Sequence, residues 1–158
     1  MGVHPHIESL DAWTGAGVRR VLPMSGLADA FGPTYERVSA AVEAAGARIV
    51  GPVYAEYFGM PSDVVDVEIG LGIDTEVEVA GLQVRTHPAT RAVVATHVGP
   101  YERLSESYRE LMPWLEMEEF ELSDSMIEFY DSAPGTDPEH LVTRLVFPFG
   151  SSGRRSPA

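Results

Sequence analysis

Apolar and polar residues alternate most regularly between positions 64 and 73, VVDVEIGLGI. Val65, Val67, Ile69 and Leu71 fall on one side of an extended chain, because successive side chains of a strand point to opposite faces. This alternation predicts a strand with one buried face. On similar grounds we expect strands at 18–24, 49–58, 91–98, 125–131 and 141–149, and an extended segment at 82–86.

Two segments have the length and spacing of helices, 33–45 (PTYERVSAAVEAA) and 100–117 (PYERLSESYRELMPWLEM). Each is preceded by glycine and begins with proline, which suits the first helical position because its missing N–H has no partner there. We therefore interpret Gly32-Pro33 and Gly99-Pro100 as equivalent helix starts. Pro113 leaves two alternatives open, a kink just before Trp114 or a helix that ends near position 112.

The predicted elements repeat in the order strand, helix, strand, strand. This order predicts an α+β fold with an N-terminal arm (1–16), a first repeat (17–75), a linker (76–88), a second repeat (89–149) and a flexible tail (150–158). The apolar stripes predict a core that includes Leu104, Leu111, Leu115, Ile127, Phe129, Val65, Val67 and Ile69.

Composition narrows the class of protein. The 158 residues, 44% of them hydrophobic, suffice for one folded domain. Eleven Lys and Arg against 24 Asp and Glu give a net charge of −13, the wrong sign for nucleic acid or anionic lipid, so we expect cationic partners. The sequence has no cysteine and no long apolar run, which excludes disulfides and thiolate chemistry and leads us to expect a cytoplasmic protein.

The sequence offers little support for metal or cofactor chemistry. The five histidines show no HExxH or comparable spacing, and the acidic segment 116–121 lacks the alternation and the turn glycine of a calcium loop. A glycine-rich phosphate loop and a Gly-x-Ser-x-Gly nucleophile elbow are also missing. We therefore expect neither a metal nor a cofactor.

One stretch of the sequence is distinctive enough to compare with known families. HVGPYERL (97–104) is followed by Tyr108, Leu111 and Trp114, then by Glu128-Phe129-Tyr130 and a closing strand that ends FPF (147–149). This pattern resembles the GyrI-like small-molecule-binding domain, a family that also includes effector domains attached to AraC- and MerR-type transcription regulators. The resemblance covers roughly residues 17–149. It implies two βαββ units related by a pseudo-twofold axis, with helices on one face of an antiparallel sheet and a ligand cleft on the other.

The resemblance also implies where a ligand binds. In the family an acidic residue on the strand after the second helix contacts cationic, often aromatic, ligands, and Glu128 matches that position. Alternation places Met126, Glu128 and Tyr130 on one face of the strand, and Ile127 and Phe129 on the other. We expect one face to meet the helix and the face with Glu128 to line the cleft.

The first repeat offers a second acid. The same alternation groups Tyr54, Glu56 and Phe58, which makes Glu56 the expected counterpart of Glu128. Many relatives carry an acidic residue on the last strand where this chain has Arg144, and we expect Arg144 to neutralise Glu128 in part. The full set of candidate ligand-binding residues is Glu128, Tyr130, Trp114, Tyr101, Tyr108, Glu56, Tyr54 and Phe147.

Three functions are compatible with this pattern. The first is a stand-alone module that senses or sequesters a small cationic or aromatic molecule in the cleft between the repeats, for example in drug or toxin tolerance. The second is a hydrolase of reactive small molecules on the same fold, with Glu128 and Tyr130 or Tyr101 as the catalytic groups. The third is a protein binder of the gyrase-inhibitor type.

Overall fold

The computed structural model describes residues 3–59, 62–118, 122–132 and 135–149. The chain divides into two compact units: a first unit of residues 11–89, and a second unit of residues 1–10 and 90–158. The tail predicted at 150–158 lies outside the described residues, as do parts of the acidic segment 116–121.

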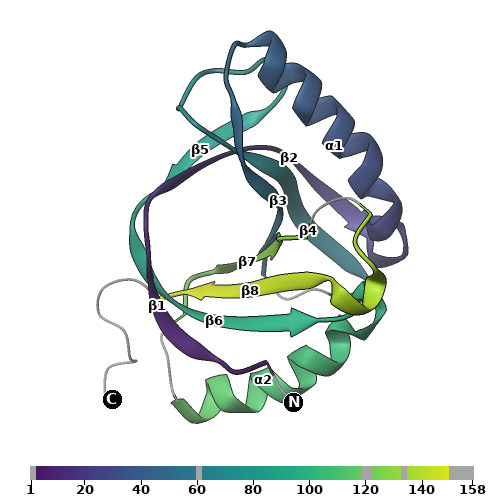
Figure 1. Ribbon diagram of the computed structural model, residues 1–158, viewed down its shortest axis with the longest axis vertical. Helices are drawn as coiled ribbons and strands as arrows, with labels where there is room; N and C mark the ends of the chain where they lie inside the picture. The colour runs from purple at the N-terminus through teal and green to yellow at the C-terminus, as the bar shows by residue number, and fades with distance from the viewer. Residues whose placement is uncertain (1–2, 60–61, 119–121, 133–134, 150–158) are drawn as a thin grey trace. The chain divides into compact units, whose positions relative to one another are not determined.

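The first unit contains one helix and four antiparallel strands. Its elements are β2 (Trp13–Pro23), a short 3₁₀ turn (Met24–Gly26), α1 (Leu27–Ala44), β3 (Ile49–Phe58), β4 (Val64–Ile73) and β5 (Gln83–His87). The strands lie in the order β3-β4-β2-β5. Figure 1 shows α1 along this sheet, where it contacts β2 and β4.

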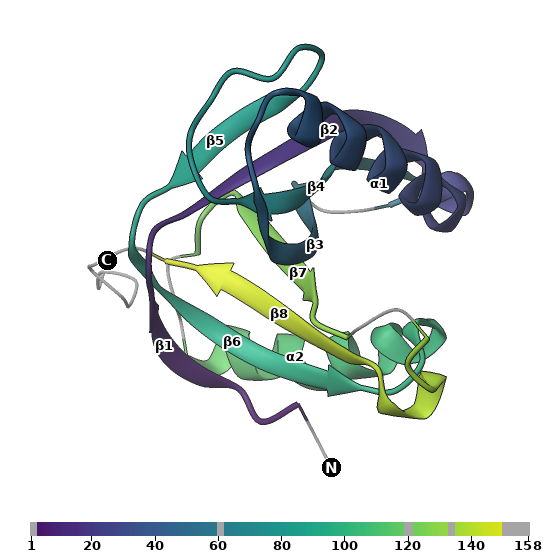
Figure 2. The same cartoon turned by 45° about the horizontal axis from the view of Figure 1, so that its top comes forward.

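The second unit repeats this plan. Its elements are β1 (His6–Leu10), β6 (Thr90–Val98), a 3₁₀ turn (Tyr101–Arg103), α2 (Leu104–Glu118), β7 (Ser125–Tyr130), a 3₁₀ turn (Pro138–His140) and β8 (Val142–Pro148). The strands lie in the order β1-β6-β8-β7, again antiparallel. Helix α2 runs beside β6, as Figure 2 shows.

Each unit is therefore a strand–helix–strand–strand motif with one extra strand. The extra strand is β5 against β2 in the first unit and β1 against β6 in the second unit. These findings confirm the predicted α+β class and the duplicated βαββ order. The extra strands come from residues 6–10 and 83–87, which the sequence analysis assigned to the arm and the linker.

The two Gly-Pro dipeptides are not equivalent helix starts, so that prediction is wrong. Pro33 lies inside α1, which begins at Leu27, whereas Pro100 directly precedes the 3₁₀ turn before α2. The true counterpart of Pro100 is Pro23: each has φ −61° and extended ψ, and each is followed by three 3₁₀ residues and then a leucine that begins the α-helix. Pro33 is the seventh residue of α1, where its missing N–H removes one intrahelical hydrogen bond, and the helix nevertheless continues to Ala44.

The remaining element predictions hold closely. Strands β3 and β4 have the predicted bounds, and β2 begins at Trp13, five residues before the expected start. Helix α2 continues through Pro113 to Glu118, which rules out the shorter helix.

Each helix covers a core of aliphatic side chains on its own sheet. In the first unit Val38 and Val42 of α1 pack on Ala16, Leu71 and Ile73. In the second unit Leu111 and Leu115 of α2 pack on side chains of β6 and β8, namely Val93, Ala95, Leu145 and Phe147. Seven of the eight predicted core residues are buried, and Leu104 packs partly buried against the same cluster.

Candidate ligand-binding site

Glu128 of β7 is a buried carboxylate surrounded by tyrosine hydroxyls. Its side chain accepts one hydrogen bond from the Tyr108 hydroxyl (2.5 Å, to Oε2) and one from the Tyr130 hydroxyl (2.6 Å, to Oε1). The residue is only 5% exposed. Burial of a carboxylate is costly unless such donors replace water, so the two hydroxyls make this position tolerable.

Glu128 lies on the face of the sheet that α2 covers, which corrects the expected orientation. Its cross-strand partner is Leu145, a member of the core beneath α2, and Tyr108 belongs to α2 itself. Met126 also packs on this core, so Met126, Glu128 and Tyr130 share one face as predicted. Alternation groups residues by face, but only the register with β8 decides which group meets the helix.

Tyr101 extends the cluster around Glu128 toward solvent. Its ring stands edge-to-face against Tyr130, with the ring centroids 5.7 Å apart, and its side chain is 44% exposed. Partial burial raises the pKa of the Tyr101 hydroxyl above its usual value. Tyr101, Tyr108, Tyr130 and Glu128 thus form one group, which we call the Glu128 cluster.

His97 has a positioning role beside this cluster. Its Nε2 lies 2.9 Å from the Pro100 carbonyl oxygen and its Nδ1 lies 2.6 Å from the Ser107 hydroxyl. The carbonyl can only accept, so Nε2 donates to it, and Nδ1 is hydrogen-bonded to the Ser107 hydroxyl. The imidazole therefore ties the end of β6 to the first turn of α2.

Arg144 does not neutralise Glu128, contrary to expectation. Its guanidinium donates to both carboxylate oxygens of Asp131, at 2.5 and 3.0 Å, and lies over the Phe129 ring. Its cross-strand partner is Phe129, which alternation places on the face opposite Glu128.

The two other candidates of this unit belong to its core. Phe147 is 6% exposed and is a member of the core cluster beneath α2, and Trp114 packs partly buried against the same cluster. Both therefore lie in the layer between the sheet and α2, on the face of the sheet that also carries Glu128.

The first unit contains a different acidic group on the face opposite α1. Tyr54 is fully buried, and its hydroxyl donates to Oε2 of Glu68 at 2.5 Å. The phenol is accommodated by glycines, since a Cβ on Gly15 would stand 2.6 Å from the Tyr54 hydroxyl oxygen and one on Gly70 would stand 2.8 Å from it. Burial raises the pKa of Tyr54, and the nearby Glu68 raises it further.

Glu56 lies directly opposite Glu68 and contacts Arg85 and His87. Glu56 and Glu68 are cross-strand partners in β3 and β4. One oxygen of Glu56, Oε1, accepts from Arg85 Nη2 at 2.5 Å and lies 3.2 Å from His87 Nε2. Trp13 stacks on His87 with ring centroids 4.1 Å apart and meets Tyr54 edge-on at 5.0 Å. We call these residues the Glu56 cluster.

The pKa of Glu68 is raised, mainly because burial disfavours its charged form. The Tyr54 hydrogen bond and the Arg85 charge act in the opposite direction, and the neighbouring Glu56 adds to the increase. Glu68 Oε1 is buried and has no hydrogen-bond partner among the described residues.

Glu56 and Glu128 are not structural counterparts, although both follow the helix of their unit. Glu56 points away from α1, whereas Glu128 points toward α2. Strand β3 has a register shift between Ile49 and Val53. The shift amounts to two residues, so Ile49 and Val53 still share the face toward α1, and it does not explain the difference. Alternation tells which residues share a face of a strand but not which face meets the helix.

Sequence reasoning missed Glu68, Arg85, His87 and Trp13. Alternation in 64–73 does place Glu68 opposite the aliphatic face, which was a usable signal. Its meeting with Glu56 and Arg85 depends on the pairing of β4 with β3 and of β2 with β5, which alternation does not specify.

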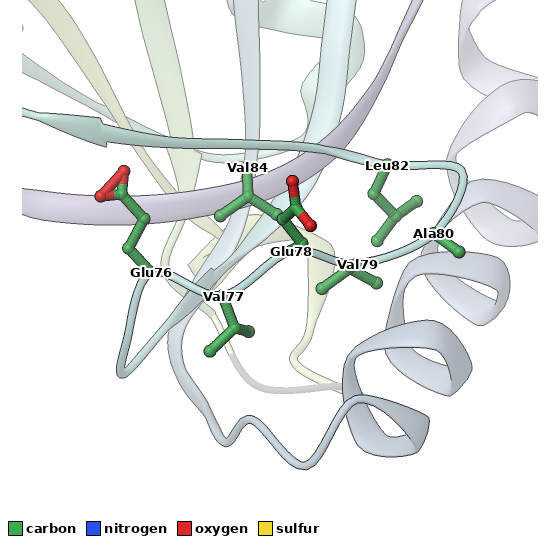
Figure 3. A pocket seen from close by; sticks show the side chains of 7 residues that line it. All are labelled: Glu76, Val77, Glu78, Val79, Ala80, Leu82 and Val84. Carbon is green, nitrogen blue, oxygen red and sulfur yellow. The ribbon is translucent and has the colours of Figure 1, made fainter.

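The first unit also has a surface hollow on the side of α1, with a volume of about 820 Å³ (Figure 3). It is lined by Glu76, Val77, Glu78, Val79, Ala80, Leu82 and Val84. None of the candidate residues is among these, and Leu82 and Val84 pack on the core beneath α1. The hollow is therefore separate from the Glu56 cluster, which lies on the opposite face of the sheet.

Within the described residues, no group of three or more His, Asp or Glu side chains is arranged to hold a metal ion. The described helices include none that is both long and apolar enough to cross a bilayer.

Comparison with solved structures identifies the fold. The C-terminal domain of EcmrR superposes with a TM-score of 0.80 at 22% identity, over 94% of this chain and 98% of that one. In the EcmrR–DNA complex the match covers 57% of the longer EcmrR chain, with 93% of this chain, 21% identity and a TM-score of 0.79.

Two further structures are similar at lower identity. SAV2435 bound to tetraphenylphosphonium has a TM-score of 0.65 at 12% identity, over 92% of this chain and 93% of that one. A protein from Listeria innocua described as a hydrolase has a TM-score of 0.62 at 13% identity, over 93% and 92% of the two chains.

A comparison with curated proteins gives no match. The family model of the GyrI-like small molecule binding domain, however, matches residues 4–149, nearly the whole chain. Together with the duplicated βαββ units, this match shows that the chain belongs to the family of GyrI-like small-molecule-binding domains.

Proposed function

We propose that this chain binds a small cationic, aromatic molecule and that Glu128 supplies the charge that recognises it. The observation that carries the proposal is the Glu128 cluster: a carboxylate only 5% exposed, two tyrosine hydroxyls bonded to it, and the half-exposed ring of Tyr101 at its outer side. Aromatic faces attract cations and a buried carboxylate provides the countercharge, so the cluster combines both means of recognition.

Two other facts support a cationic ligand. The net charge of −13 attracts cations toward the protein. SAV2435, which shares the fold, is bound to tetraphenylphosphonium, a cation that carries four aromatic rings. Such a module acts by sensing or sequestering its ligand. Sequestering a toxic ligand would give it a role in drug tolerance.

The test compares Glu128→Gln with the unaltered chain. The substitution keeps the shape of the side chain and removes its charge. A charge-assisted contact is worth about 1.5–3 kcal/mol, so affinity for tetraphenylphosphonium should fall about ten- to hundredfold. Affinity for neutral triphenylphosphine oxide should fall much less. The titration is read from the emission of Trp114 in a Trp13→Phe background, because the chain has two tryptophans.

The matched control is Glu116→Gln, which removes the same charge from an exposed position on α2. It should leave both affinities unchanged. Equal losses for the cation and the neutral compound in Glu128→Gln would contradict the proposed role of Glu128.

A second candidate function is hydrolysis of a strained, electrophilic ring. The observation in its favour is the Tyr130 hydroxyl 2.6 Å from Glu128 Oε1, a base and a proton donor side by side, on a fold shared with a protein described as a hydrolase. In this reaction Glu128 takes a proton from water, the water oxygen bonds to a ring carbon, and the ring oxygen leaves with a proton from tyrosine.

Turnover decides between the two functions. With the chain far below an aryl epoxide in concentration, a hydrolase forms many equivalents of diol, and Glu128→Gln stops product formation while the substrate still binds. A binding module forms no diol above the uncatalysed rate.

A further inference from the structure

We propose that Arg85 occupies a second cation site, formed by Glu56 and Glu68, and that a planar amidinium or guanidinium compound binds there in its place. The inference rests on the proposed function, because it extends cation binding to the first unit. Glu56 was a candidate from the sequence, whereas Glu68, Arg85 and the rings beside them were not.

The charges of the Glu56 cluster are not balanced by Arg85 alone. Arg85 Nη2 donates to Glu56 Oε1 at 2.5 Å but stands 3.7 Å from Glu68 Oε1, beyond hydrogen-bond range. Glu68 Oε1 is buried and has no hydrogen-bond partner among the described residues. A buried acceptor without a donor is costly, so this oxygen marks an incomplete site.

The geometry indicates the class of the ligand. Arg85 Nη2 donates to Glu56 and only approaches Glu68. An amidinium carries two N–H groups on one edge and can donate to two oxygens at once. The position between Glu56 Oε1 and Glu68 Oε1 therefore suits a flat, delocalised cation with paired donors. An ammonium, a point charge without a fork of donors, matches it less well.

Arg85 is the part of the cluster that is free to move. It belongs to β5, an edge strand of the first unit, and its side chain is 44% exposed, compared with 4% for Glu56 and 1% for Glu68. Its guanidinium can turn into water, while the two carboxylates stay in place. A vacated pair of buried carboxylates favours the binding of another cation, because an unpaired buried charge is strongly destabilising.

The surroundings favour an aromatic cation. The stacked rings of Trp13 and His87 border the site, and the Phe58 ring lies 5.8 Å from the Arg85 guanidinium carbon. The other nearby cation, Arg19, is already held by both oxygens of Asp66 and lies 3.8 Å over Phe58. It therefore does not compete for the two glutamates. The charged or titratable groups around Arg85 come from β2, β3, β4 and β5, and they are Arg19, Tyr54, Glu56, Asp66, Glu68 and His87.

The experiment titrates benzamidine, a flat aromatic amidinium, against a Trp114→Phe background in which Trp13 is the reporter. Arg85→Gln removes the resident cation and should bind benzamidine about tenfold more tightly than the parent chain. Benzamide, its neutral analogue, should show no gain. The control Arg48→Gln removes the same charge from an exposed position in the same unit and should not change either affinity.

A double variant tests whether benzamidine binding depends on the Glu56 carboxylate. Glu56→Gln with Arg85→Gln removes the cation together with one carboxylate, so benzamidine should bind it less tightly than it binds Arg85→Gln. If Arg85→Gln alone does not fold, benzamidine should restore its native circular dichroism, because a ligand that binds only the native state stabilises it. Failure of that rescue overturns the proposal, as does equal or weaker benzamidine binding by a folded Arg85→Gln chain.

The two proposals fail in distinguishable ways. If Glu128→Gln binds tetraphenylphosphonium as tightly as the parent chain, read from Trp114 emission, the proposed function is contradicted. The result for Arg85 is unaffected by that outcome. Absence of a gain in benzamidine affinity, read from Trp13, contradicts only the Arg85 site.

Discussion

Glu56 and Glu68 stand directly opposite each other on β3 and β4, and both are almost completely buried. Like charges at directly opposed positions of a sheet repel each other, and burial strengthens that repulsion. The repulsion is offset by a guanidinium on Glu56, a phenol on Glu68 and a raised pKa at Glu68. This pair therefore makes stability depend on pH.

We expect Glu68→Gln to stabilise the protein increasingly as the pH rises from about 4.5. A raised native pKa means that the folded state holds the Glu68 proton more tightly than the unfolded chain, whose pKa is near the ordinary 4.5. The contribution is fully present below that value and is lost as the pH rises through the native pKa. The amide of the variant stays neutral throughout, and its carbonyl oxygen can still accept from Tyr54.

The measurement is the free energy of unfolding in urea from pH 4 to pH 8 for both chains. The difference between variant and parent should grow with pH and then level off. A difference that is constant over this range would show that Glu68 ionises normally in the folded state.

Tyr108→Phe should destabilise the protein by about 1.5–3 kcal/mol, the usual range for a hydrogen bond to a charged group. The substitution leaves the ring in place and removes one of the two phenol donors to Glu128. Tyr35→Phe on α1 is the control, because Tyr35 is 45% exposed, and it should cost less than about 0.5 kcal/mol. Equal losses of stability in the two variants would mean that the Tyr108–Glu128 hydrogen bond contributes nothing to the stability of the fold.

Two glycine substitutions should change the free energy of unfolding in opposite directions. A Cβ on Gly70 would lie 2.2 Å from the Ala16 carbonyl oxygen and 2.7 Å from Gly17 Cα, so Gly70→Ala forces β2 and β4 apart and should cost at least about 1–3 kcal/mol. Gly32 lies inside α1 with nothing within 4 Å of its Cβ position. Gly32→Ala should therefore stabilise the helix by about 0.5–1 kcal/mol.

Thermal or urea unfolding of both variants checks this contrast. Destabilisation by Gly32→Ala would mean that Gly32 needs a conformation that only glycine adopts, as a helix start at Gly32-Pro33 would require.

Leu111→Ala should destabilise by about 2–5 kcal/mol, because Leu111 is fully buried in the core beneath α2 and its removal leaves a cavity. Met117→Ala, on the same helix but 80% exposed, should change stability by less than about 0.5 kcal/mol. A small effect at Leu111, measured in urea, would contradict the packing of α2 on β6 and β8.

Local pattern predicted the elements well where side chains alternate or repeat regularly. Strands β3 and β4 have the expected bounds, and the apolar stripe of α2 identifies Leu111 and Leu115 as core. The start of α1 could not be found in this way. Pro33 suggested a helix start, but the helix begins at Leu27, after Pro23 and a 3₁₀ turn, and Pro33 is its seventh residue. The Gly-Pro pattern therefore did not locate the start of this helix.

The candidate acidic residues show the same limit of local pattern, which does not reveal contacts between distant parts of the chain. Alternation correctly grouped Glu128 with Tyr130, and Glu56 with Tyr54, because that grouping depends only on the pleat of one strand. It did not reveal Tyr108 as a donor to Glu128, or Glu68 and Arg85 as neighbours of Glu56. Those contacts join residues that are 12 to 29 positions apart along the chain.

The sequence by itself determined the βαββ order, the faces on which residues gather and the family, because these follow from local periodicity and from a specific string of residues around Gly99-Pro100. Only the tertiary structure decided that Glu128 faces the helix of its unit while Glu56 faces away from the other helix. The physical reason is that alternation defines the two faces of a strand but not which of them meets the helix, and that choice depends on how the strand pairs and packs in the folded unit.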